Sequence, residues 1–169
     1  PENGTAIFQE YYANHQGEEV VFVSDGQFNE SMHDEVGNPM SNVYGTAPMA
    51  DGSGIETFTN AYESAYNRQP ALFNAHAYDG TAVVLLANAA AGENDGNAIR
   101  AEISNVTESP GTEVQPGGLE AGLRAAAAGE QVHYRGASGE IEFDRNGDIS
   151  AVKYEYFTYG ADGVTSLEE

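Results

Sequence analysis

The stretch that decides the fold is Glu19–Gly26, EVVFVSDG, in the first fifth of a chain of 169 residues. Its first five residues, Glu19–Val23, form a short apolar run, which is typical of a buried strand. Ser24-Asp25-Gly26 then turns the chain where that strand ends. In open α/β sheets, ligands bind beyond the carboxyl ends of the strands. The stretch therefore predicts a strand of a parallel sheet and a candidate binding residue, Asp25.

Helices and strands alternate on both sides of this stretch. Residues 72–91 are apolar almost all round, which indicates a long central helix buried on several sides. The other predicted elements are helices over 5–14 and 27–36, a strand over 42–46, a helix that starts at a Ser53–Glu56 capping box, a helix through Ile99 and Val106, a surface loop over 107–118, and a helix from Leu119 to Gly129. This alternation predicts an α/β domain with a parallel sheet.

The pattern changes after residue 130. Residues 140–144 alternate strictly between polar and apolar, 145–148 (RNGD) contain the Asn-Gly hairpin signal, and 149–159 form a long aromatic strand. The same segment resembles a calcium loop, with Glu155 eleven residues past Asp144. However, Ile149 replaces the Gly that the sixth position needs, so a β-turn between two strands is the favoured interpretation.

Charge is the unusual feature of the composition. The chain has 27 Asp and Glu against six Lys and Arg, a net charge of −21, and no Cys. A nucleic-acid surface is excluded because phosphate binding needs clustered cations, and the charge argues against docking on anionic lipid. Disulfides, thiolate catalysis and Cys-ligated metals are excluded as well. The acids are scattered rather than run together, and a domain with this charge repels itself in dilute buffer. We therefore expect a protein from a halophile.

Two groups of residues could carry chemistry. Asp25 could hold a ligand ammonium by a charge-assisted hydrogen bond, or it could cap a helix that starts near Gln27; from spacing alone the cap is favoured. His76 and Asp79 could form one wall of a site, although a polar patch near a helix start is the favoured interpretation. An enzyme, such as a metal-assisted hydrolase that uses Asp25, His76 and Asp79, has no motif in its support.

Five strings, taken in order, give the chain a family resemblance. They are Val21–Gly26 (VFVSDG), Val43–Thr46 (VYGT), the spaced Phe58, Tyr62, Tyr66 and Pro70, Ala77–Gly80 (AYDG), and Tyr134–Gly139 (YRGASG) followed by Phe143-Asp144 and Asn146–Asp148. This set resembles the substrate-binding proteins of branched-chain amino-acid ABC transporters, which have the type I periplasmic-binding-protein fold of the Leu/Ile/Val-binding family.

The resemblance implies a fold of two α/β lobes joined by a hinge, with the ligand between them. The chain matches the carboxyl-terminal lobe. We therefore expect residues 1–169 to form a single three-layer, Rossmann-like lobe, with an alternating part over 1–130 and a β-hairpin part over 131–169. The amino-terminal lobe would lie before Pro1.

The resemblance also implies a function without catalysis, cofactor or metal. Asp25, with Gly26 beside it, would hold the α-amino group of a branched-chain or related small amino acid. Phe73 or Tyr78 would line the pocket, and a core role is favoured for Tyr78. The partners would be this ligand and a membrane permease, and the full-length protein would be lipid-anchored on the extracellular face of the membrane. The same fold could instead bind an amide, urea, an aromatic acid or another small solute, or act as a ligand-sensing regulator.

Overall fold

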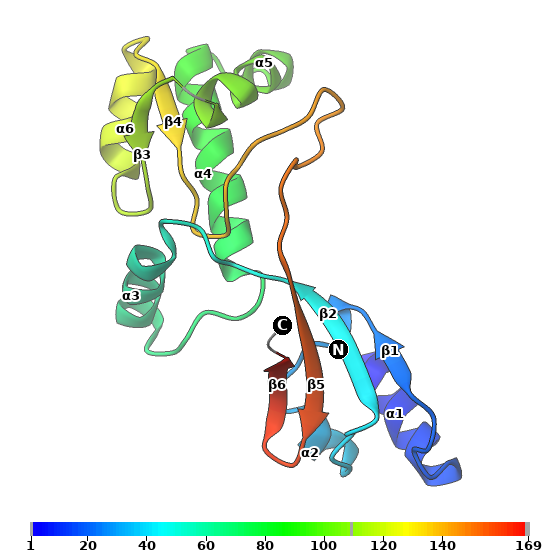
Figure 1. Cartoon of the computed structure of the whole chain (residues 1–169). Helices are drawn as coiled ribbons and strands as arrows, with labels where there is room; N and C mark the ends of the chain where they lie inside the picture. Colours follow the sequence, from blue (N-terminus) through cyan, green and yellow to red (C-terminus); the bar gives the residue numbers. More distant parts are fainter. Residues whose placement is uncertain (1, 109, 168–169) are drawn as a thin grey trace. The chain divides into compact units, whose positions relative to one another are not determined.

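A computed structural model describes residues 2–108 and 110–167 of the chain, which divide into two compact units (Figure 1). Unit 1 comprises the chain up to Met49 and again from Lys153 onward. Unit 2 runs from Ala50 to Val152. The chain passes between these units at 49/50 and 152/153, and the single lobe with its two parts over 1–130 and 131–169 stays a prediction.

Unit 1 is built on a mixed sheet. Its elements are α1 (Glu2–Asn14), β1 (Val21–Val23), the 3-10 helix η1 (Asp25–Gln27), α2 (Met32–Val36), β2 (Val43–Pro48), β5 (Tyr154–Gly160) and β6 (Gly163–Leu167). The strand order is β1-β2-β5-β6, in which β1 and β2 are parallel and the other two pairs are antiparallel. The predicted strands at Glu19–Val23 and 42–46 are therefore present, as neighbours in one sheet.

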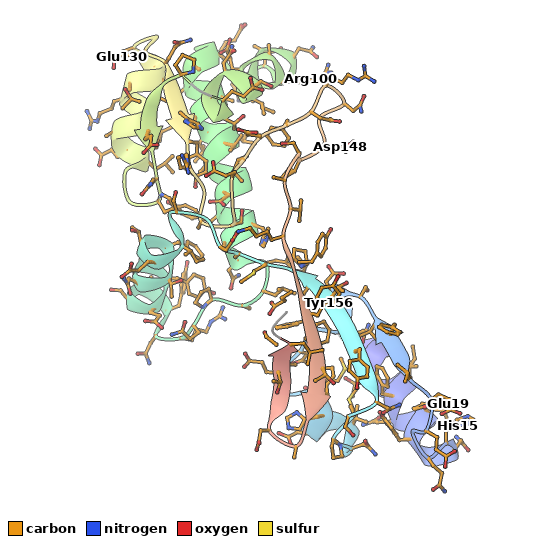
Figure 2. The ribbon with its side chains drawn as sticks, viewed as in Figure 1. His15, Glu19, Arg100, Glu130, Asp148 and Tyr156 are labelled. Carbon is orange, nitrogen blue, oxygen red and sulfur yellow. The ribbon has the colours of Figure 1, made fainter. Side chains whose placement is uncertain are left out.

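Alternation along the strands gives this sheet one buried and one exposed face. Val43, Ala47 and Phe157 are completely buried on the first face, where Gly45 leaves room for the Phe157 ring opposite it in the register. Phe22 and Tyr156 lie on the second face and are 79% and 51% exposed; Tyr156 is labelled in Figure 2. The core of unit 1 therefore lies on the face that β2 and β5 share.

Unit 2 is organised around one long helix. Its elements are α3 (Ile55–Tyr66), α4 (Asn74–Ala91), α5 (Gly96–Thr107), β3 (Thr112–Val114), α6 (Leu119–Ala127) and β4 (Val132–Tyr134). Strands β3 and β4 pair in parallel, and α4 packs against both α5 and α6. Leu86 and Ala87 of α4 are completely buried in a core that also contains Val106, Val132 and Tyr134. The predicted central helix over 72–91 is thus confirmed as α4.

The α/β class is confirmed, but several predicted details are wrong. Residues 107–118 are not only a loop, since they contain β3. The N-cap of α3 is Gly54 and no side chain caps it, so the Ser53–Glu56 capping box is not formed. The carboxyl-terminal hairpin exists, but its strands are β5 and β6, which pair with each other from Tyr156 to Leu167.

The 145–148 turn is confirmed as a turn and not as the centre of that hairpin. The Asp144 carboxylate accepts hydrogen bonds from the main-chain N–H groups of Asn146 and Asp148, at 2.8 and 3.0 Å, and these bonds lower the pKa of Asp144. Phe143 and Ile149 form one isolated antiparallel bridge. Strand β5 starts only at Tyr154, where its antiparallel pairing with Pro48 of β2 begins.

Candidate functional site

The Ser24–Gly26 turn lies where the sequence predicts it, directly after β1 and therefore at the carboxyl end of a parallel strand. Asp25 is half-buried and begins η1, and Gly26 is exposed. The main-chain oxygen of Asp25 accepts a hydrogen bond from the N–H of Phe28 at 2.9 Å. Within residues 2–108 and 110–167, no protein group donates a hydrogen bond to the Asp25 carboxylate. The carboxylate can therefore accept hydrogen bonds from a ligand.

The alternative that Asp25 caps a helix from Gln27 is wrong. Residues 25–27 are themselves the 3-10 helix η1, whose N-cap is Ser24. The next α-helix, α2, begins at Met32 with Ser31 as its N-cap. The predicted helix over 27–36 is thus shorter and later than expected. Asp25 precedes α2 by too many residues to satisfy any of its N–H groups.

Strand β5 holds the segment that carries Asp25. The hydroxyl of Tyr159 donates a hydrogen bond to the main-chain oxygen of Gln27 and accepts one from the N–H of Asn29 at 3.2 Å. The ring of Phe28 packs edge-on against Phe157, with 5.0 Å between the ring centroids. Burial of the Tyr159 hydroxyl raises its pKa. Asp25 therefore sits between β1, a strand of the sheet, and a segment over 27–29 that contacts β5.

Phe73 and Tyr78 lie near the start of α4 in unit 2. Phe73 is the N-cap residue of α4 and is 45% exposed, with its ring 5.8 Å from that of His76. Tyr78 is half-buried, one turn further along, and its ring centroid is 5.2 Å from that of Phe58 on α3. The structure thus places these two predicted residues at one end of one helix, and Asp25 and Gly26 in unit 1.

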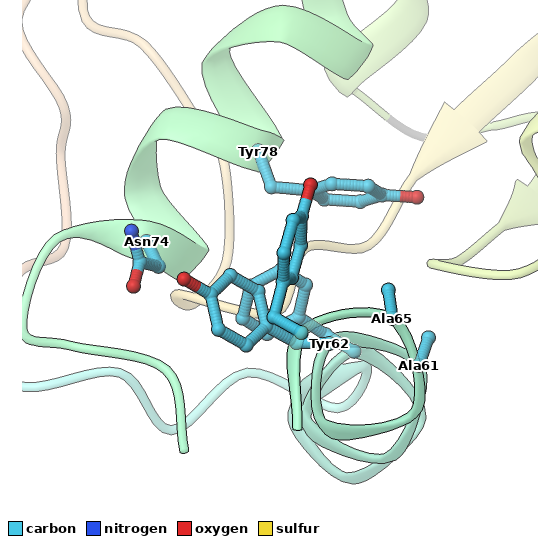
Figure 3. A pocket seen from close by; sticks show the side chains of 7 residues that line it. Ala61, Tyr62, Ala65, Asn74 and Tyr78 are labelled. Carbon is cyan, nitrogen blue, oxygen red and sulfur yellow. The ribbon is translucent and has the colours of Figure 1, made fainter. Parts of the chain in front are cut away.

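A pocket of about 270 Å³ opens between α3 and the start of α4 (Figure 3). Aromatic rings make up most of its lining, together with small side chains and one amide. The lining residues are Phe58, Ala61, Tyr62, Ala65, Tyr66, Asn74 and Tyr78. Among these lining residues, Tyr78 is the one predicted from the sequence as a candidate ligand-binding residue. The spacing of Phe58, Tyr62 and Tyr66 predicts an apolar helix face. It does not predict that this face borders a pocket.

Asp79 has a structural role. Its side chain is 1% exposed, and its two carboxylate oxygens accept four hydrogen bonds. The donors are the Tyr134 hydroxyl at 2.7 Å, the Ala137 N–H at 3.0 Å, the Ser138 N–H at 2.6 Å and the Ser138 hydroxyl at 2.5 Å. Asp79 therefore fastens the 134–138 segment to α4, and its lone pairs are used within the protein.

The hydrolase alternative gains no support from this geometry. Across the two described ranges, no group of three or more His, Asp and Glu side chains could hold a metal ion. His76 and Asp79 are neighbours on α4, but Asp79 is fully engaged with Tyr134 and Ser138.

Within residues 2–108 and 110–167, no helix is long and apolar enough to cross a membrane.

The Tyr134–Asp79 contact predicts a loss of stability at high pH. Burial, and then the hydrogen bond to Asp79, raise the pKa of Tyr134 far above its ordinary value of 10.0. Above pH 10 the unfolded chain loses this proton and the folded chain keeps it, so stability falls as pH rises. We expect Tyr134→Phe to reduce the alkaline slope of the unfolding free energy by about 1.4 kcal/mol per pH unit.

Urea unfolding between neutral pH and pH 11 measures this slope. Tyr154→Phe is the matched control, because Tyr154 is 57% exposed. An alkaline slope that is the same in Tyr134→Phe and in the unsubstituted chain would contradict a protonated, buried Tyr134.

Comparison with known proteins gives a family match and a fold match. The sequence profile of a family described as "Periplasmic binding protein" matches residues 5–159. The structure is similar to a leucine binding protein from Thermotoga maritima, with a TM-score of 0.67 and 20% identity, over 97% of this chain and 40% of that one. No curated protein matches the sequence significantly.

Two further solved structures have the same fold. One is an ABC transporter substrate-binding protein from Desulfitobacterium hafniense, with a TM-score of 0.52 and 18% identity, over 97% of this chain and 40% of that one. The other is a type 1 periplasmic binding protein from Bordetella pertussis, with a TM-score of 0.58 and 15% identity, over 98% and 44%. The chain spans less than half the length of these proteins, and at such identities the likeness shows the fold alone.

Proposed function

Because the chain belongs to the periplasmic binding protein family, we propose that it is part of the solute-binding component of an ABC transporter. Its ligand in this proposal is a branched-chain or related small amino acid, and its protein partner is the membrane permease that receives the ligand. The proposal fits the fold of its solved neighbours, of which one is a leucine binding protein.

The observation that carries the proposal is the Asp25 carboxylate at the end of β1. The carboxylate follows the carboxyl end of a parallel strand, the position where open α/β sheets bind ligands. No described protein group donates a hydrogen bond to it. An α-ammonium group can donate charge-assisted hydrogen bonds to such a carboxylate. Gly26 beside it has no side chain to obstruct a ligand. Phe73 and Tyr78, which belong to unit 2, are proposed as further ligand-contacting residues.

Binding without chemistry means that the ligand acts by shifting a conformational equilibrium. Ligand contacts from both sides of a cleft favour the closed state of a hinged protein. The permease would then recognise this closed state. Because the chain spans about 40% of the length of its solved neighbours, we propose that other residues of the whole protein supply the contacts to the ligand carboxylate.

The cellular location and the salt conditions are also part of the proposed function. We propose that the protein works on the extracellular side of the membrane, where solute-binding components meet their ligands. A lipid anchor would need a Cys outside these residues, because the 169-residue sequence contains none. The excess of acids leads us to propose that it works in molar salt.

Substitution of Asp25 tests the proposed site. We expect leucine, added to the chain in molar KCl, to shift the amide NMR signals of Asp25 and Gly26. In Asp25→Asn we expect the apparent affinity to fall by roughly tenfold or more, because the loss of a charge-assisted hydrogen bond costs at least about 1.4 kcal/mol. The exposed Asp162→Asn, also in unit 1, is the matched control.

The probe 4-methylpentanoate separates recognition of the ammonium from recognition of the side chain. It keeps the carbon skeleton and carboxylate of leucine and lacks the amino group, so we expect it to leave the Asp25 signals in place. Equal shifts with the two compounds, or unchanged leucine affinity in Asp25→Asn, would remove Asp25 from the site.

A further inference from the structure

The pocket between α3 and α4 has a lining that selects for a particular kind of ligand. Four rings from two helices surround it: Phe58, Tyr62 and Tyr66 on α3, and Tyr78 on α4. The rings of Tyr62 and Tyr66 lie 4.6 Å apart between centroids, and those of Phe58 and Tyr78 lie 5.2 Å apart. Figure 3 shows the tyrosine rings gathered around the opening, with the alanine side chains beside them. The pocket therefore presents aromatic surfaces.

No charged side chain lines this pocket. Its one amide, Asn74, already uses its side-chain oxygen to accept a hydrogen bond from the Ala71 N–H at 2.6 Å. The lining also offers the Asn74 amide N–H and the tyrosine hydroxyls, and ring faces and methyl groups make up most of the remaining surface. Ring faces carry negative partial charge, so they attract cations and repel anions. The net charge of −21 acts in the same direction.

One of these rings already holds a cation of the protein itself. The guanidinium carbon of Arg68 lies 5.2 Å from the centroid of Tyr62, within the roughly 6 Å range of a cation–π contact. The chain has only six Lys and Arg residues, and one of them lies beside a ring that lines this pocket. The face of Tyr62 is thus shown to accept a positive group.

From the lining and the Arg68 contact, we propose that the pocket between α3 and α4 binds a small organic cation through its aromatic rings, with a quaternary ammonium group as the recognised feature. The volume of about 270 Å³ lies just under the range of pockets for drug-sized ligands, so the ligand is small. This proposal does not involve the Asp25 carboxylate of unit 1, although the pocket shares Tyr78 with the residues proposed to contact the amino acid.

A pair of isosteric probes tests the charge requirement. Choline carries a trimethylammonium group, and 3,3-dimethylbutan-1-ol replaces its nitrogen with carbon and is neutral. We expect calorimetric titration of the chain, at constant molar KCl, to give saturable choline binding and binding of the neutral probe that is weaker by about fivefold or more. Equal affinity for the two probes, or no saturable binding of choline, would overturn the proposal.

Substitutions on the pocket wall test its location. Tyr66 is 63% exposed, so Tyr66→Leu should fold, and we expect it to weaken choline binding by about fivefold. Arg68→Gln removes the cation of the protein itself from beside the Tyr62 ring, and we expect it to strengthen choline binding because the repulsion between two cations near one ring is lost. Tyr156→Leu, at an exposed position in unit 1, is the control and should leave binding unchanged.

The outcomes for the two proposed sites can be told apart. Asp25→Asn should leave choline binding as it is, and Tyr66→Leu should leave the leucine-induced shifts at Asp25 as they are. Choline binding that is unchanged in Tyr66→Leu, or that Tyr156→Leu weakens to the same extent, would place the cation elsewhere and would refute the proposal for this pocket.

Discussion

Replacement of Asp79 by alanine is expected to destabilise unit 2 by at least about 3 kcal/mol, because four donors would lose their acceptor at once. These donors are the Tyr134 and Ser138 hydroxyls and the main-chain N–H groups of Ala137 and Ser138. Asp79 is 1% exposed, so water cannot easily replace the carboxylate. Such a loss is a large part of the 5–15 kcal/mol that stabilises a domain.

Asp79→Asn is the sharper variant because it preserves the shape of the side chain. An amide offers one acceptor oxygen, and its NH₂ group would face donors that the second carboxylate oxygen now satisfies. We therefore expect Asp79→Asn to be destabilising as well. Guanidinium unfolding followed by circular dichroism gives the free energies, and amide hydrogen exchange at Ala137 and Ser138 reports the local opening.

Glu130→Gln is the matched control for this series. Glu130 is an exposed carboxylate of the same unit, just after α6, and is labelled in Figure 2. Its substitution should change the unfolding free energy by no more than about 0.5 kcal/mol. If Asp79→Asn proved as stable as Glu130→Gln, the four hydrogen bonds could not be what fastens the 134–138 segment to α4.

The role of Asp79 shows where inference from local sequence reaches its limit. Its spacing from His76 is visible in the sequence and suggests a polar wall. Its partners, Tyr134, Ala137 and Ser138, lie between 55 and 59 residues further along the chain. No periodicity connects positions so far apart. Long-range contacts of this kind decide whether a buried acid is a ligand-binding group or a structural anchor.

The strands also separate what local sequence predicts from what depends on tertiary pairing. The position of strand β1 is predicted correctly, because an apolar run that ends in Ser-Asp-Gly is a local signal. The expectation that this strand is buried is wrong, since β1 is the edge strand of its sheet and Phe22 is 79% exposed. Strands β3 and β4 have three residues each, and they form because they pair with each other across α6. Similarly, β5 starts at Tyr154 because its partner is β2, where Thr46 lies opposite Tyr156. Such pairings are set by the tertiary fold and not by the residues at the turn.

For the candidate site, the sequence predicts where the candidate residues lie in the fold better than it predicts what their side chains do. The turn at Asp25 follows its strand as expected, and the structure excludes the capping alternative. Phe73 and Tyr78 lie at the start of α4 as expected. The pocket that Tyr78 shares with Phe58 and Tyr62 could not be predicted, because it depends on how α3 and α4 pack.

Removal of salt is expected to have an effect as large as the loss of Asp79. The chain has 27 acids and six Lys and Arg, so 27 − 6 leaves 21 acids without a cation of their own even if every cation pairs with one acid. The ion pairs of Arg124 and Arg135 with Glu120, Glu113 and Glu140 neutralise few of them. The screening length is about 30 Å at 0.01 M salt and about 3 Å at 1 M, so dilute buffer leaves the repulsion at full strength.

We therefore expect the thermal midpoint to rise steadily from dilute to molar KCl, with much of the chain unfolded at the dilute end. KCl also strengthens apolar burial to some degree, so the charge effect needs its own control. A variant that converts exposed acids such as Glu18, Glu93, Glu130 and Asp162 to amides should keep the apolar core and depend less on salt. The charge mechanism predicts that the two curves converge in molar KCl, where screening makes the acids nearly neutral to one another. Parallel curves, or stability that declines as KCl increases, would assign the acid excess to another cause.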